Sequence, residues 1–100
     1  MKLVFHTPGI TEIQSDAILI RSGRDALDFI MDPDIQEPKK IIFQKHHFSP
    51  EFFDLKTGIA GDVLQKFVNY QTQVAIIGDF SDTSEHFQSL IRENNRGNTI

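Results

Sequence analysis

The sequence predicts an α/β domain with a mostly parallel central sheet. Two short, unbroken apolar runs, at residues 41–43 and 74–77, are typical of parallel strands that are covered on both faces. Between them, apolar side chains recur at helical spacing over residues 59–68. Because strands that alternate with helices form parallel sheets through crossover connections, we expect the two runs to be neighbouring strands in the middle of the sheet.

The N-terminal part of the chain predicts an antiparallel hairpin. Residues 2–6 and 10–14 alternate between apolar and polar side chains, and Pro8-Gly9 between them suits the centre of a type II turn. Residues 17–20 are apolar, and they either form a short extended segment or continue the second strand after a break.

About three helices are expected, and each follows a residue that can cap its N-terminus. The first would end near residue 32, a short helical turn would cover residues 50–55, and Gly97 would end the last helix. The predicted caps are Ser22, Ser49, Thr57 and Ser84. The side chains expected to face the core are Ala26, Leu27, Ile30 and Met31 in the first helix, Ile59, Val63, Leu64, Phe67 and Val68 in the main helix, and Phe87, Leu90 and Ile91 in the third.

Composition excludes several classes of function. The chain has no cysteine, which removes disulfide frameworks, thiolate metal sites and thiol catalysis. Its 14 acidic and 10 scattered basic residues argue against nucleic acid as a partner. No apolar run approaches the roughly 18 residues of a membrane span, so we expect no membrane contact and a cytoplasmic location. The length of 100 residues predicts one domain, with most of the nine phenylalanines in its core.

Four segments spread over nearly the whole chain carry a family resemblance: ALDFI at residues 26–30, FFDLKTGIAGDVLQKFVNY at 52–70, VAIIGDFS at 74–81 and NNRGN at 94–98. They resemble a bacterial family of uncharacterised proteins, domain-of-unknown-function family 4180. The resemblance implies a shared fold and no particular activity. It also implies a further strand and a short helix beyond Ile100, so that an unpaired edge at residues 98–100 would pair with a second copy in a homo-oligomer.

A second resemblance is to STAS domains, the fold of anti-sigma-factor antagonists, through Asp54, Thr57 and Gly58. In that motif an aspartate leads through one residue to a phosphorylated serine or threonine and then a glycine, whereas two residues separate Asp54 from Thr57 here. The resemblance implies a STAS-like, non-catalytic module that binds a regulatory protein partner. The surface implied for that partner comprises Asp54, Lys56, Thr57, Gly58 and Gly61.

The residue types alone favour a structural role for the same segment. Thr57 suits the N-cap of the main helix, where its hydroxyl would accept a hydrogen bond from the Ala60 amide. Gly58 and Gly61 would let the backbone approach a neighbouring element closely. A regulated hydroxyl at Thr57 is the functional alternative, since a helix N-terminus stabilises a phosphate.

An alternative ligand site lies at the carboxyl edge of the sheet, where open α/β sheets bind small molecules. The candidate residues follow the two central strands and are His46, His47, Ser49, Asp79 and Ser81. Adjacent histidines in an extended loop point to opposite sides, so we expect exposed side chains and no metal. A triad of Ser49, a histidine and Asp79 lacks the GxSxG elbow, and Asp79 suits an Asx turn with Phe80 tucked inward. We therefore expect no catalytic residue and no cofactor.

Overall fold

The computed structural model describes residues 1–6, 9–35 and 39–96. Its main elements, in chain order, are β1 (Lys2–His6), β2 (Ile10–Gln14), α1 (Gly23–Ile30), β3 (Lys40–Gln44), α2 (Ile59–Asn69), β4 (Gln73–Ile77) and α3 (Glu85–Arg96). Three short 3-10 helices connect β3 to α2, namely η1 (Lys45–His47), η2 (Pro50–Phe53) and η3 (Leu55–Thr57).

The four strands form one mixed sheet in the order β1-β2-β3-β4. β1 is antiparallel to β2, while β2, β3 and β4 are parallel and place Ile41 between Thr11 and Val74. The predicted hairpin, the mostly parallel sheet and the pairing of β3 with β4 are confirmed. The predicted type II turn includes Pro8, which lies outside the described residues.

The predicted central position of β4 is wrong. Among the described residues, β4 has a strand neighbour on one side only, and Ile77 at its end is 53% exposed. β4 is apolar for a different reason, because helices cover one face of the sheet and Val74 is buried on that face. A predicted last strand at residues 98–100 lies outside the part of the chain that the structure describes.

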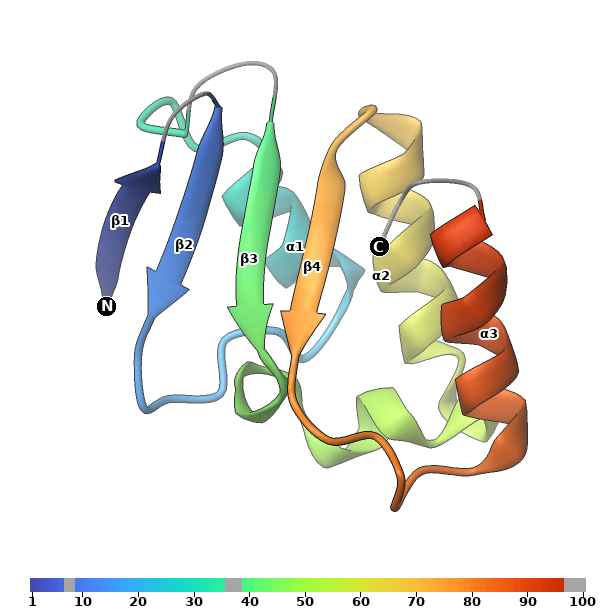
Figure 1. Ribbon diagram of the computed structural model, residues 1–100. Coiled ribbons are helices and arrows are strands. Elements are labelled where there is room, and N and C mark those ends of the chain that lie inside the picture. Colours follow the sequence, from blue (N-terminus) through green and yellow to red (C-terminus); the bar gives the residue numbers. More distant parts are fainter. Residues whose placement is uncertain (7–8, 36–38, 97–100) are drawn as a thin grey trace.

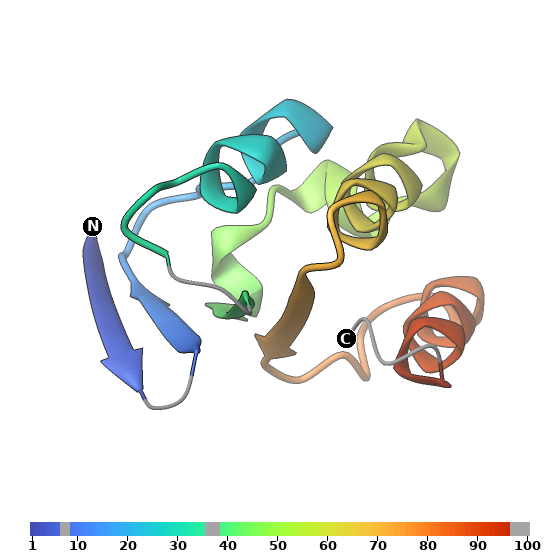
Figure 2. The same ribbon diagram turned by 90° about the horizontal axis from the view of Figure 1, so that it is seen from above.

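Two helices cover one face of the sheet, and the third lies beyond the β4 edge. α1 and α2 lie side by side on the same face, while α3 continues the molecule past β4 (Figures 1 and 2). Ser22 and Ser84 cap α1 and α3 as predicted, because their hydroxyls accept hydrogen bonds from the Asp25 and Phe87 amides. Across the described residues, no helix has the length and apolar character needed to cross a membrane.

Phenylalanine rings fill the core between the sheet and the helices. Phe43 of β3 makes edge contacts with Phe29 and Phe48, at centroid distances of 5.2 and 5.5 Å. The buried phenylalanines are Phe29, Phe43, Phe48, Phe52, Phe67 and Phe87, which confirms their predicted place in the core.

Two inward-facing predictions are wrong. Met31, 54% exposed, is already the C-terminal cap of α1, and Val68, 46% exposed, turns away from the buried face that contains Phe67.

Candidate functional site

The carboxyl ends of β2, β3 and β4 meet at one edge of the sheet, the lower edge in Figure 1. Ile20 pairs in parallel with Phe48 there, and the Ser49 amide donates to the Ile20 carbonyl oxygen at 3.0 Å. This pairing resolves the two alternatives for residues 17–20, because Ile20 joins the segment after β3 and does not extend β2. The connection after β2 therefore contributes residues to the same edge.

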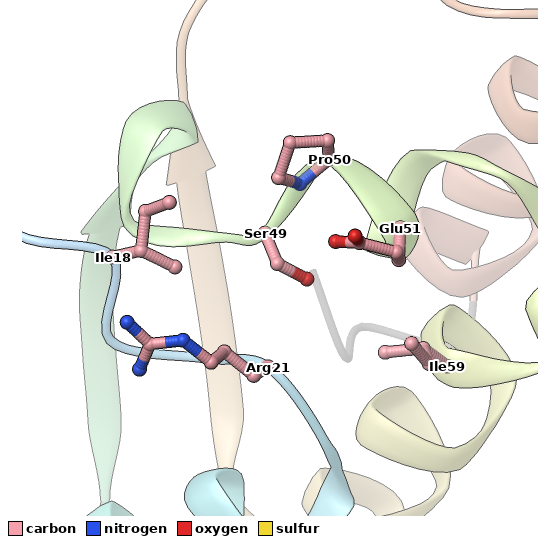
Figure 3. A pocket seen from close by; sticks show the side chains of 6 residues that line it. All are labelled: Ile18, Arg21, Ser49, Pro50, Glu51 and Ile59. Atoms are coloured by element: carbon pink, nitrogen blue, oxygen red, sulfur yellow. The ribbon is translucent and has the colours of Figure 1, made fainter.

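One cavity at this edge, here called the Ser49 cavity, has a volume of about 390 Å³ and is shown in Figure 3. Its lining residues are Ile18, Arg21, Ser49, Pro50, Glu51 and Ile59. Ser49 is only 5% exposed, and its hydroxyl oxygen has no hydrogen-bond partner among the described residues. A buried hydroxyl without a partner costs about 1–3 kcal/mol, so a polar group that came within hydrogen-bond distance of the Ser49 oxygen would remove that cost.

Two opposite charges line the same cavity as the Ser49 hydroxyl. The Glu51 carboxylate points toward Ser49, whereas the Arg21 side chain extends away from both, with its guanidinium on the Ile18 side of the cavity (Figure 3), and both charged residues are exposed. Neither charged side chain forms an ion pair with another described residue. The Arg21 backbone is fixed, because its amide donates to Asp25 Oδ2 at 2.8 Å. The cavity thus offers one cationic, one anionic and one neutral polar group together with an apolar wall.

A second cavity, here called the Lys45 cavity, lies between the ends of β3 and β4 and has a volume of about 500 Å³. It is lined by Gln44, Lys45, His46, Pro50, Phe53, Ile77 and Gly78. The Lys45 ammonium already donates to the Asp79 carbonyl oxygen at 2.6 Å and to Asp82 Oδ1 at 2.7 Å. It also lies 5.6 Å from the ring centroids of Phe53 and Phe80. Lys45 therefore ties the loop after β4 to β3, and little of its hydrogen-bonding capacity is left for a ligand.

The two histidines point to the same place, which corrects the predicted opposite orientation. His46 Nε2 and His47 Nε2 lie 2.8 and 2.9 Å from the Ser15 carbonyl oxygen, and their ring centroids are 4.4 Å apart. The reason is local, because both residues belong to the 3-10 helix η1 and not to an extended loop. His46 is exposed as predicted, but His47 is fully buried.

The hydrogen bonds of His47 fix its neutral form. The Gln44 amide donates to His47 Nδ1 at 2.9 Å, so that the ring proton must be on Nε2, which donates to the Ser15 carbonyl oxygen. Burial lowers the pKa of His47, the bond to Ser15 raises it, and the nearby His46 lowers it further, with a net lowering. His47 is consequently a structural group that joins the end of β3 to the connection after β2.

Asp79 and Ser81 lie in the loop after β4, where both are exposed. Asp79 Oδ1 accepts a hydrogen bond from the Ser81 amide at 2.9 Å, which confirms the predicted Asx turn. Hydrogen bonds from the Ser81 amide and hydroxyl lower the pKa of the Asp79 carboxyl. No hydrogen bond joins Ser49, a histidine and Asp79, so the described residues form no acyl-transfer triad. Nor do they contain a group of three or more histidine or acidic side chains positioned to hold a metal ion.

Thr57 is not the N-cap of the main helix, contrary to the prediction. Gly58 takes that position with a left-handed φ of 74°, and the Thr57 hydroxyl accepts from the Ile59 amide at 3.2 Å instead of from Ala60. The same hydroxyl lies 2.8 Å from the carbonyl oxygens of Glu51 and Asp54. Thr57 therefore holds the turn between η2 and α2 together.

The glycines of the same segment also differ from the prediction. A Cβ at Gly58 or Gly61 would meet no atom within 4 Å, so neither residue allows a close approach, and Gly58 is needed for its positive φ alone. Asp54, Lys56, Thr57, Gly58 and Gly61 are all exposed and lie along the start of α2.

A protein-family model matches residues 6–100 of the chain. The family is described as "Domain of unknown function (DUF4180)". The chain belongs to the DUF4180 family. No curated protein and no solved structure matches the chain. The family assignment confirms the resemblance seen in four sequence segments, and it adds no activity to this DUF4180 domain.

Five of the six residues that line the Ser49 cavity are not among the predicted site residues, and two of them, Arg21 and Glu51, are charged. Ile18 and Arg21 follow β2, and Glu51 follows Ser49-Pro50 at the start of η2. The sequence does contain a signal for Arg21, because every parallel strand of a sheet sends its following loop to the carboxyl edge. The predicted edge residues come from the loops after β3 and β4 alone, since the sequence leaves two alternatives open for residues 17–20. Of the predicted edge residues, the structure of this DUF4180 domain places Ser49 in the Ser49 cavity and His46 in the Lys45 cavity.

Proposed function

We propose that this DUF4180 domain is a non-catalytic module of the bacterial cytoplasm that binds a small polar molecule in the Ser49 cavity. The observation that carries the proposal is the buried Ser49 hydroxyl, which faces the cavity without a hydrogen-bond partner. A volume of about 390 Å³ lies in the range of small-molecule sites, and its position at the carboxyl edge is where open α/β sheets bind ligands. A binding role fits better than hydrolysis, because both ring nitrogens of His47 already hold backbone groups.

The experiment is an NMR titration of the isotopically labelled domain with a set of small polar metabolites. Binding in the Ser49 cavity should shift the amide signals of residues 18–21, 49, 51 and 59, and Ser49→Ala should weaken those shifts. Ser81→Ala, in the exposed loop after β4, is the matched control and should leave them unchanged. The proposal is wrong if every compound that binds perturbs only the residues of the Lys45 cavity, or if none binds at millimolar concentration.

A second candidate function is a STAS-like regulatory module that docks a protein partner at the start of α2. Its support is that Asp54, Lys56, Thr57, Gly58 and Gly61 are all exposed and lie close together in the chain. Thr57 is a poor choice for a probe there, because its hydroxyl holds the turn and a substitution would alter the fold locally. Lys56 is better suited, since its side chain is exposed and makes no ion pair with a described residue.

The test compares Lys56→Glu with Lys2→Glu, which makes the same charge change on the distant strand β1. If a partner docks at the start of α2, purified partner should bind Lys2→Glu normally and Lys56→Glu weakly. Equal binding by both variants would rule this surface out.

A further inference from the structure

The residues that line the Ser49 cavity indicate which class of ligand fits it. We infer that it binds a zwitterionic α-amino acid with an aliphatic side chain, with the ligand carboxylate on Arg21 and its ammonium on Glu51. The inference rests on the proposed function and specifies the class of molecule. Its basis is that two opposite charges without ion-pair partners and a buried hydroxyl without a hydrogen-bond partner line one cavity.

Arg21 supplies the anion-binding group. Its guanidinium presents donors in a planar fork that matches a carboxylate, and no described acidic side chain forms an ion pair with it. Asp25 is the acidic group nearest along the chain, and its Oδ2 accepts from the Arg21 backbone amide instead. The backbone of Arg21 is thereby held while the guanidinium stays available at the cavity.

Glu51 supplies the cation-binding group. Its backbone is anchored, because its carbonyl oxygen accepts hydrogen bonds from the Thr57 hydroxyl at 2.8 Å and from the Asp54 amide at 3.2 Å. The carboxylate lies at the cavity and points toward Ser49 (Figure 3). An ammonium group has three donors and no acceptor, so it satisfies a carboxylate that lacks an internal partner.

Ser49 and the apolar wall restrict the ligand further. The Ser49 hydroxyl can donate to the ligand carboxylate or accept from its ammonium, and either bond would satisfy a group that is otherwise unpaired. Ile18, Pro50 and Ile59 provide apolar surface for a hydrocarbon side chain. A zwitterion can pair with both charged residues at once, whereas a ligand with a single charge can pair with only one of them, which favours the zwitterion.

The test is a calorimetric titration of the domain with L-leucine and with two analogues that each lack one charged group. Isopentylamine lacks the carboxylate, and 4-methylpentanoate lacks the ammonium. Leucine should bind at least about tenfold more tightly than either analogue, because each analogue loses one charge-assisted contact, and a tenfold change in affinity corresponds to about 1.4 kcal/mol. Inorganic phosphate serves as a probe for simple anion binding at Arg21.

Matched variants locate the site. Arg21→Gln, Glu51→Gln and Ser49→Ala should each weaken leucine binding by about tenfold. Arg24→Gln and Glu85→Gln, which make the same charge changes at exposed residues outside the cavity, should bind as the unaltered domain does. Thermal melting of each variant distinguishes a lost contact from a lost fold.

The outcomes separate the inference from the proposed function. If phosphate or either analogue binds as tightly as leucine, or if Arg21→Gln leaves leucine binding unchanged, the amino-acid inference is overturned while small-molecule binding stands. If leucine, valine and isoleucine all fail to bind at millimolar concentration but another compound shifts the NMR signals of the cavity residues, the amino-acid inference is again overturned while small-molecule binding stands. If no small molecule binds there, both the inference and the proposed function fail.

Discussion

The Asp62 carboxylate accepts a hydrogen bond from the Gly23 amide, with 3.1 Å between Oδ2 and the nitrogen. This bond joins the first turn of α2 to the first residue of α1, 39 positions apart in the chain. Asp62 also forms an ion pair with Lys66 on the next turn of α2, at 3.4 Å. One carboxylate therefore satisfies an orphan helix amide and fixes how the two helices meet.

A side chain at Gly23 would meet the Asp62 carboxylate. A Cβ atom there would lie 2.2 Å from Asp62 Oδ2, so Gly23→Ala must displace the carboxylate and break its hydrogen bond. The carboxylate is the exposed end of a flexible side chain and can move aside, so we expect the free energy of unfolding to fall by about 0.5–1.5 kcal/mol, the net contribution of one hydrogen bond, measured by urea denaturation.

Gly61→Ala provides the matched control, since a Cβ at that position meets no atom within 4 Å. Alanine is the better helix former, and the control should gain up to about 1 kcal/mol of stability. If the two variants lose stability equally, close approach at Gly23 is not the cause.

Removal of the unpaired Ser49 hydroxyl should not destabilise the ligand-free domain. Ser49→Ala deletes a buried polar atom that has no hydrogen-bond partner among the described residues, so the free energy of unfolding should stay the same or rise by up to about 1 kcal/mol. Ser84→Ala is the comparison, because it removes an N-terminal cap of α3 and should cost about 1 kcal/mol. A loss at Ser49 as large as that at Ser84 would show that the hydroxyl is satisfied in solution.

His47 should make stability dependent on pH. The pKa of His47 in the folded state lies below its ordinary value of 6.5, so the unfolded chain binds more protons between the two values. Its contribution to stability is therefore complete above about pH 6.5 and is lost as the pH falls through the folded-state pKa. Denaturation midpoints measured from neutral to mildly acidic pH should show this decline.

Substitution separates His47 from its neighbour His46. In His47→Asn, a side-chain oxygen can still accept from the Gln44 amide without titrating, so the decline below pH 6.5 should become smaller. His46→Asn leaves the buried ring in place and should retain most of the decline. The opposite result would assign the pH dependence to His46.

The end of α2 offers a stabilising substitution. Gln71 has a φ of 54°, and the amides of Gln71 and Thr72 donate to the Val68 and Phe67 carbonyl oxygens, which is the Schellman pattern. Glycine is the usual residue at this left-handed position, so Gln71→Gly should raise the free energy of unfolding by about 0.5–1 kcal/mol. Gln65→Gly, inside the same helix, should lower it by about 1 kcal/mol. Equal effects would contradict the strain at Gln71.

The fold class was predictable because hydrophobic periodicity and helix-capping residues indicate it. The alternation of residues 2–6 and 10–14, the inward-facing Val63, Leu64 and Phe67 of α2, and the caps at Ser22 and Ser84 are local patterns, and the structure confirms them. The position of β4 was not predictable in the same way. An apolar strand that helices cover has the same sequence pattern whether it has one strand neighbour or two.

The site was predicted in part for a related reason. Ser49 was identified from its place after β3, and Arg21 could have been identified from its place after β2. Glu51 becomes a candidate only when the tertiary structure places the connection after β2 beside η2. The buried position of His47 likewise depends on its hydrogen bond to the carbonyl oxygen of Ser15, which is 32 positions away in the chain. Side-chain partners that come from a different crossover leave no local pattern in the sequence.

The sequence separation between the parallel strands affects the order in which the strand pairs form and the rate of folding. β1 and β2 pair His6 with Ile10 across a short turn, whereas Thr11 pairs with Ile41 and Ile41 with Val74, at separations of 30 and 33 positions. Closing such long loops costs conformational entropy before any strand contact repays it, and folding rates fall as contacts become less local. The hairpin is accordingly the only strand pair in the described sheet that can assemble early. Refolding after dilution from denaturant should be slower than for an all-helical chain of equal length.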